Sequence, residues 1–113
     1  MTELSHLVLV TDETFEQEVI RSTLPVVVDF YADWCAPCRT AEPVLEELST
    51  RLAGRVKFAK VNVDESGGVT QSFGIHSVPT YLFVERGREK GREIGAVGSN
   101  EFRTILQRYF AFA

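Results

Sequence analysis

Residues 26 to 38 read Val26-Val27-Val28-Asp29-Phe30-Tyr31-Ala32-Asp33-Trp34-Cys35-Ala36-Pro37-Cys38, and this stretch decides the fold. Its first six residues are almost continuously apolar and β-branched, which is typical of a strand buried on both faces of a parallel sheet. The two cysteines that follow are the only ones in the chain. A Cys-x-x-Cys pair that follows a strand and opens a helix predicts a dithiol that cycles to a disulfide.

The predicted helix start assigns different roles to the two sulfurs. Unpaired N–H groups and the helix dipole favour thiolate over thiol at a helix N-terminus, so we expect Cys35 to be nucleophilic and accessible. Cys38, one turn further along, is expected to be more buried and to act as the resolving thiol. The alternatives are a structural disulfide and half of a zinc site, for which only His6 and His76 remain as nitrogen donors. A disulfide across so short a loop would stabilise the fold by roughly 2 kcal/mol at most, a weak reason to keep it.

The rest of the chain divides into short strands and helices. Strands are predicted at 7–10, 26–31, 56–63, 81–84 and 89–94, and helices at 13–22, 35–53, 69–73 and after Gly95. Thr11 and Asp12 offer capping side chains to the first helix, and Pro43 should kink the second. Arg86-Gly87-Arg88 predicts a hairpin turn between two antiparallel strands. This order predicts an α/β fold with a mixed sheet and helices on both faces.

Composition narrows the class of protein. The chain has 113 residues and is 44% hydrophobic, so we expect a single domain spanning residues 1–113. No basic stretch or long apolar run occurs near the N-terminus, so we expect no signal peptide and no membrane span. We therefore expect a soluble, cytoplasmic protein, and a monomer. Basic residues between 86 and 92 alternate with acidic ones, which is typical of a solvated hairpin and not of a nucleic-acid-binding surface.

The chain resembles the thioredoxin family over nearly its whole length. The resemblance is carried by residues 28–38 and by Pro43, Lys60-Val61-Asn62-Val63-Asp64, Gly74-Ile75, Val78-Pro79-Thr80, Phe83, Gly87 and Gly95. It implies a thioredoxin fold, which is a three-layer α/β/α sandwich with a central five-stranded mixed sheet and four helices. The chain departs from the commonest family pattern at Ala36, where Gly is usual, at Tyr31 and at Arg39. Such changes can shift the redox potential, so its value stays open.

Asp29 interrupts the apolar strand, and burial of a carboxylate without a partner raises its pKa. The resemblance implies that this carboxylate lies behind Cys38 and helps to deprotonate it through water, which makes Asp29 a proton shuttle. It also implies that Lys60 lies close to Asp29 and tunes it. The alternatives are an aspartate that reaches solvent at the strand end and an ordinary surface lysine.

A client-binding surface is predicted beside the cysteines. The resemblance implies a cis peptide bond before Pro79, which exposes the backbone of Val78 for strand-like pairing with an extended client segment. A tryptophan that borders a reactive cysteine is predicted to form part of a docking rim. The predicted patch consists of Trp34, Ala36, Pro37, Val78, Gly95 and Ala96.

The resemblance implies an enzyme that reduces protein disulfides through Cys35 and Cys38. The resemblance also implies that this enzyme needs no bound cofactor or metal beyond its own redox-active disulfide. Its implied partners are an NADPH-dependent flavoprotein, thioredoxin reductase, and diverse disulfide-containing clients, with no nucleic acid and no membrane. One alternative is a disulfide oxidase or isomerase, which usually has a more polar or His-containing dipeptide between the cysteines. Another is a thioredoxin-fold binding module in a larger assembly, which would be expected to lose a cysteine or the Val78-Pro79 turn.

Overall fold

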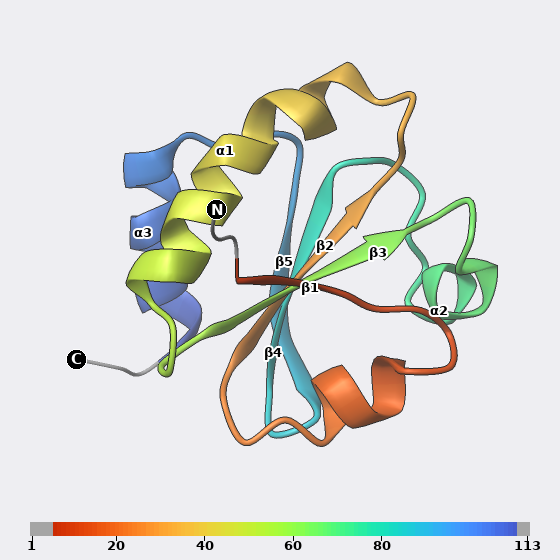
Figure 1. Ribbon diagram of the computed structural model, residues 1–113, viewed down its shortest axis with the longest axis horizontal. Helices are drawn as coiled ribbons and strands as arrows, with labels where there is room; N and C mark the ends of the chain where they lie inside the picture. The colour runs from red at the N-terminus through yellow and green to blue at the C-terminus, as the bar shows by residue number, and fades with distance from the viewer. Residues whose placement is uncertain (1–5, 111–113) are drawn as a thin grey trace.

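The computed structural model describes residues 6–110, which form one mixed sheet flanked by helices (Figure 1). The strands are β1 (Leu7–Leu9), β2 (Val26–Tyr31), β3 (Lys57–Asn62), β4 (Thr80–Glu85) and β5 (Arg88–Ile94). The helices are η1 (Glu16–Ile20), which is a short π-helix, α1 (Ala36–Arg51), α2 (Gly67–Ser72) and α3 (Ser99–Tyr109). Within residues 6–110, no helix has the length and apolar character needed to cross a membrane.

The sheet places the cysteine-bearing segment at its centre. The strand order is β1-β3-β2-β4-β5, with β2 parallel to β3 and antiparallel to β4. Residues 86 and 87, between β4 and β5, have φ values of 54° and 78°, the left-handed backbone that a tight hairpin turn requires. The predicted five-stranded mixed sheet and its final antiparallel pair are therefore confirmed.

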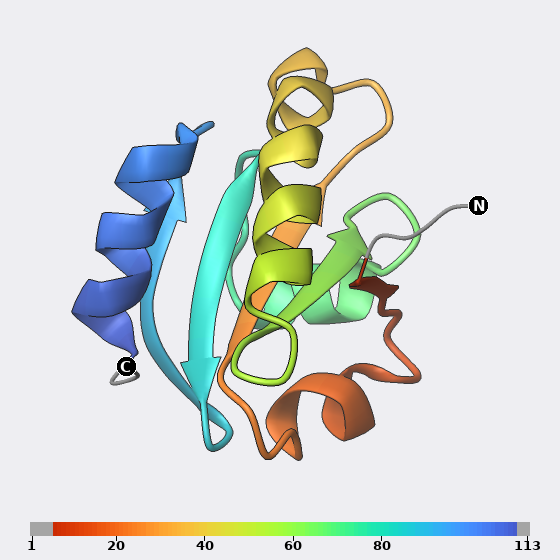
Figure 2. The ribbon, with the colours of Figure 1, turned by 60° about the vertical axis from the view of Figure 1, so that its left-hand side comes forward.

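Two apolar cores lie on opposite faces of the sheet. Figure 2 shows α1 and α3 covering one face, while η1 and α2 lie against the other. Strand β2 serves both cores because successive side chains alternate: Val27 packs with α1 and α3, and Val28 packs with η1 and α2. The predicted three-layer α/β/α arrangement is confirmed.

Several boundaries differ from the sequence prediction by a few residues. The observed strands end within one residue of the predicted bounds. Helix α1 begins one residue after Cys35 and ends two residues before Ala53, whereas α2 begins at Gly67 and not at 69. Pro43 lies inside α1, which continues past it to Arg51, and the expected kink stays a prediction.

The predicted first helix, residues 13–22, is wrong in length and in its cap. Only the short η1 forms in this segment, and none of the side chains described between residues 6 and 110 caps it by a hydrogen bond. The Asp12 carboxylate instead accepts hydrogen bonds from the backbone N–H groups of Gly68 at 3.1 Å and Val69 at 2.8 Å. These donors lie in the first turn of α2, where backbone N–H groups lack partners within the helix. Asp12 thus joins the loop after β1 to α2 across the fold.

Candidate redox site

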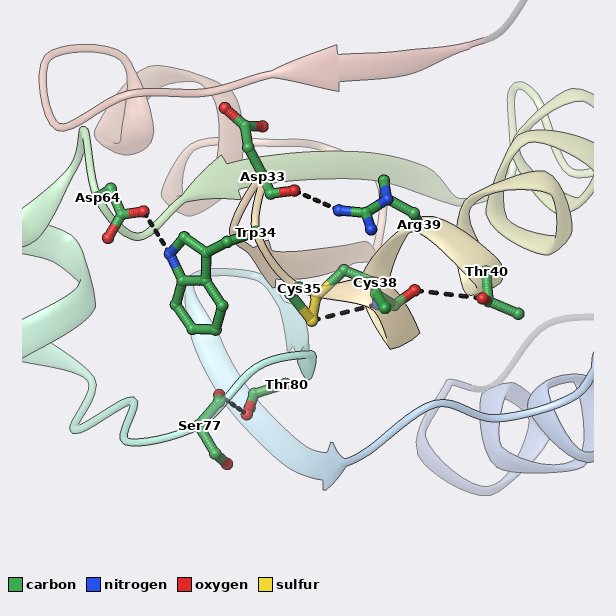
Figure 3. Close-up of a disulfide and its surroundings, with 10 residues drawn as sticks. Asp33, Trp34, Cys35, Cys38, Arg39, Thr40, Asp64, Ser77 and Thr80 are labelled. Atoms are coloured by element: carbon green, nitrogen blue, oxygen red, sulfur yellow. Dashed lines mark hydrogen bonds between the residues drawn. A yellow bond between two sulfur atoms is a disulfide. The ribbon is translucent and has the colours of Figure 1, made fainter.

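The two cysteines form a disulfide at the N-terminus of α1, with their Cα atoms 5.3 Å apart (Figure 3). Cys35 is the N-cap of the helix and has extended backbone angles, and its Sγ accepts a hydrogen bond from the backbone N–H of Cys38 at 3.2 Å. Pro37 occupies the first turn, where its missing N–H removes no helical hydrogen bond. The cap residue therefore holds its sulfur against the donor groups of the helix start.

The two cysteines are almost equally buried, contrary to the prediction. Cys35 is 4% exposed and Cys38 is 6% exposed, so the expectation that Cys35 is the more accessible is wrong for the disulfide form. The short bridge holds both residues in one apolar cluster with Ala32, and Tyr31, Val63 and Val78 pack against that cluster. A difference in reactivity must therefore come from electrostatics at the helix start and not from exposure in this state.

Asp29 is buried on the face of β2 that packs against α1, and its location behind Cys38 stays a prediction. Its side chain follows Val27 in the strand alternation, and the residue is 5% exposed. Within residues 6–110 its Oδ1 atom is buried without a hydrogen-bond partner. Burial raises the pKa of Asp29 to about 7, while Lys60 acts to lower it and Glu42 to raise it. The predicted rise in this pKa is confirmed.

Lys60 lies beside Asp29 on the neighbouring strand, because the two residues are register partners between β2 and β3. Its Nζ forms an ion pair with Oε2 of Glu42 at 3.0 Å and lies 4.4 Å from the centre of the Tyr31 ring. Sequence reasoning missed Glu42. The signal was its spacing, because a residue four positions after Cys38 lies on the same face of the helix.

A cavity of about 310 Å³ opens beside Cys38. It is lined by Tyr31, Ala32, Asp33, Cys38, Arg39, Glu42 and Lys60. Both residues of the Glu42–Lys60 ion pair line the cavity. Because this lining is polar, water can approach Cys38 through the cavity. Arg39 donates to the backbone carbonyl of Asp33 at the same edge (Figure 3).

Trp34 stands on the other side of the disulfide and is 68% exposed. Its indole N–H donates to the Asp64 carboxylate at 2.8 Å, which fixes the ring beside Cys35 (Figure 3). The role of Asp64 was missed, although it follows the end of β3 while Trp34 follows the end of the parallel strand β2. The carboxyl ends of parallel strands meet at the same edge of a sheet, and that was the available signal.

A groove of about 220 Å³ separates Trp34 from the segment before β4. It is lined by Trp34, Val63, Thr70, Ile75, His76, Ser77 and Val78. The Val78–Pro79 peptide bond is cis, as predicted. Within residues 6–110 the N–H and C=O groups of Val78 have no backbone partner, so they remain available to an extended segment.

The remaining predicted patch residues surround the same edge. Ala36 and Pro37 are exposed in the first turn of α1. Gly95 has a φ of 98°, and its N–H donates to the Pro79 carbonyl at 2.9 Å, which ties the loop after β5 to the cis-proline segment. Ala96 follows and is exposed. Their use as a client-binding surface stays a prediction.

Comparisons with known proteins agree with this geometry. A family model described as thioredoxin matches residues 6–108. The chain is 45% identical to a thioredoxin of Rickettsia bellii over 76% of this chain and 82% of that protein. It is 41% identical to a thioredoxin 1 of Nostoc over 88% and 94%, and 35% identical to a thioredoxin of Haemophilus influenzae over 96% and 99%. Within residues 6–110, no group of three or more His, Cys, Asp and Glu side chains could hold a metal ion.

Proposed function

This chain belongs to the thioredoxin family and is a thiol-disulfide oxidoreductase, and from this premise we propose how its residues divide the chemistry. Cys35 is the attacking thiolate and Cys38 is the resolving thiol. The observation that carries this assignment is the N-cap position of Cys35, whose sulfur accepts a backbone N–H hydrogen bond. Those N–H groups and the helix dipole stabilise a thiolate at Cys35 better than at a position inside the helix.

The reaction proceeds through one mixed disulfide. The Cys35 thiolate attacks a sulfur of the client disulfide, so that a Cys35–client bond forms and the other client sulfur leaves as a thiolate. Cys38 then loses its proton, and its thiolate attacks the Cys35 sulfur. The Cys35–Cys38 disulfide forms, and the second client sulfur is released. The client gains two electrons, and this protein loses two.

Asp29 accepts the Cys38 proton through water in the second step. Its pKa of about 7 supports this role, because both protonation states are populated at neutral pH and a base works best near the working pH. The cavity that contains Cys38 and Lys60 in its lining supports access of that water. Lys60 tunes the carboxylate from the neighbouring strand.

An extended client segment docks between the Trp34 ring and the cis-proline segment. The groove between them and the available backbone groups of Val78 support strand-like pairing, in which main-chain hydrogen bonds supply affinity for many different sequences. Ala36, Pro37, Gly95 and Ala96 extend the surface around Pro79. We further propose that the protein works in the cytoplasm as a single-domain monomer and is re-reduced by an NADPH-dependent flavoprotein, thioredoxin reductase.

The division of roles is tested with a synthetic peptide that contains one intramolecular disulfide. We expect the reduced Cys38→Ser variant to accumulate a mixed disulfide with the peptide and the Cys35→Ser variant to form essentially none. Accumulation with Cys35→Ser instead would reverse the assignment. The equilibrium reduction potential, measured against glutathione, separates the reductase from an oxidase or isomerase, because a strongly oxidising value would favour the latter.

A further inference from the structure

Glu42 binds Lys60, the one cation that lies beside Asp29 in the described part of the chain. It projects from α1 one turn after Cys38, and its carboxylate binds the Lys60 ammonium at 3.0 Å. The Lys60 side chain is only 17% exposed and lies over the Tyr31 ring, so its position is defined from two sides. An ion pair this sheltered is stronger and better ordered than a pair at the open surface.

Two carboxylates therefore compete for a single ammonium group. Asp29 is the register partner of Lys60, and both side chains lie on the face of the sheet that α1 covers. The Asp29 Oδ1 atom nevertheless has no hydrogen-bond partner within residues 6–110, whereas Glu42 is paired. The Lys60 ammonium is thus bound by Glu42, with which it lines the cavity beside Cys38.

We propose that Glu42 is a positioning residue for disulfide exchange: by binding Lys60 it keeps this cation from pairing with Asp29, whose carboxylate then remains free to exchange protons with Cys38. This inference rests on the proposed function of Asp29. Glu42 touches neither client nor sulfur in the scheme, and it acts through Lys60.

Among residues 6–110, the other charged or titratable groups around the pair do not offer Asp29 a competing cation. They are Tyr31 on β2, Asp33 after it, Arg39 on α1 and Tyr81 on β4. Burial raises the pKa of both tyrosines above the usual range, so they are neutral near pH 7. Arg39 is held by the backbone carbonyl of Asp33. Lys60 is accordingly the group whose placement Glu42 controls.

The test is a Glu42→Gln variant compared with a Glu47→Gln variant. Glu47 lies on the same helix and pairs with Arg51 at 3.2 Å, so its variant loses the same charge and an ion pair without touching Lys60. The Asp29 carboxyl is titrated by ¹³C NMR in the reduced protein. We expect the midpoint to fall by about 0.5 pH unit or more in Glu42→Gln, because Lys60 becomes available to Asp29, and to stay unchanged in Glu47→Gln. An unchanged midpoint in Glu42→Gln would overturn the inference.

A Lys60→Met background shows whether the effect passes through Lys60. If it does, Glu42→Gln shifts the Asp29 midpoint by less than half as much when Lys60 is absent. An equal shift in both backgrounds would mean that Glu42 acts by its own charge, which overturns the positioning role.

The kinetic readout is the pH profile of mixed-disulfide resolution with the synthetic peptide. We expect its acidic limb to move to lower pH in Glu42→Gln by the same amount as the NMR midpoint, and not to move in Glu47→Gln. If Glu42→Gln reduces the peptide with an unmoved profile, the inference fails and the proposed function stands. Failure of the proposed function is separately visible, because wild-type protein would then leave the peptide disulfide intact.

Discussion

The backbone N–H of Cys38 points at Sγ of Cys35 from 3.2 Å away. This contact is a helix cap in which a sulfur takes the place of the usual side-chain oxygen, with Cys35 as the N-cap residue. A thiolate in that position gains more from the N–H donor than a neutral thiol does, because hydrogen bonds to charged acceptors are about twice as strong as neutral ones. Reduction therefore leaves Cys35 in a site prepared for negative charge.

Alkylation of the reduced protein at neutral pH should modify Cys35 at least about ten times faster than Cys38, because the thiolate is the reactive form. The rates are measured by mass spectrometry of peptides after timed quenching with iodoacetamide. The same measurement in the denatured protein is the control, and there the two cysteines should react alike. Faster modification of Cys38 in the native protein would contradict the assigned roles.

Replacing Asp29 with Asn should stabilise the protein at neutral pH. The folded pKa of about 7 lies above the unfolded value near 3.8, so the folded state binds the proton more tightly. Ionising the buried Asp29 carboxyl therefore lowers the free energy of unfolding. This destabilisation is absent below about pH 4, grows as pH rises toward 7 and is constant above it. At 1.36 kcal/mol per pH unit its upper limit is about 4 kcal/mol.

Urea titrations at pH 4 and pH 8 test this prediction. We expect Asp29→Asn to raise the free energy of unfolding by about 1–3 kcal/mol at pH 8 and to leave it nearly unchanged at pH 4. Disulfide exchange should become slower at the same time, because Cys38 loses its proton acceptor. A variant that is less stable at pH 8 and equally fast would identify Asp29 as a structural residue.

Replacing Asp64 with Ala should weaken client binding without weakening the fold. The exposed Trp34 ring loses the hydrogen bond that orients it, and ordering it on binding then costs about 0.5–1.5 kcal/mol. We expect KM for the disulfide peptide to rise about 2–10-fold, with kcat and the free energy of unfolding nearly unchanged. Glu65→Ala, an exposed acidic residue next in sequence, is the control and should leave KM unaltered. Equal KM values for both variants would show that the indole needs no anchor.

Replacing Gly91 with Ala should destabilise the protein by about 1–3 kcal/mol, because an added Cβ would overlap the Tyr109 ring where α3 packs on β5. Gly67→Ala is the matched control. Its Cβ, in the first turn of α2, would meet none of the described atoms within 4 Å, so we expect little change in stability. Thermal unfolding of the two variants in parallel measures both effects. A Gly91→Ala protein as stable as wild type would mean that α3 can shift on the sheet.

Several features of the site could be predicted from sequence because their physical causes are local. The apolar run of β2 determines a strand buried on both faces, and the Asp29 within that run must be desolvated whichever elements cover it. The spacing of Cys35 and Cys38 around a helix start determines one cap residue and one helical residue on the same face. The tight turn at Gly87 reverses the chain direction, so the strands before and after it must run antiparallel.

Other features were decided only when the fold brought distant segments together. The Asp12 carboxylate could accept hydrogen bonds from the first turn of either η1 or α2. The tertiary structure placed it at Gly68 of α2, 56 residues away in sequence. Lys60 could equally have faced solvent, Asp29 or Glu42, and the packing of α1 on the sheet settled the pairing with Glu42. The two cysteines are likewise almost equally buried because Tyr31, Val63 and Val78 pack against the cluster that contains both of them. Charged and capping side chains can bind many different partners. The local sequence therefore determines which types of interaction they can form, and only the tertiary packing determines which partner each one binds.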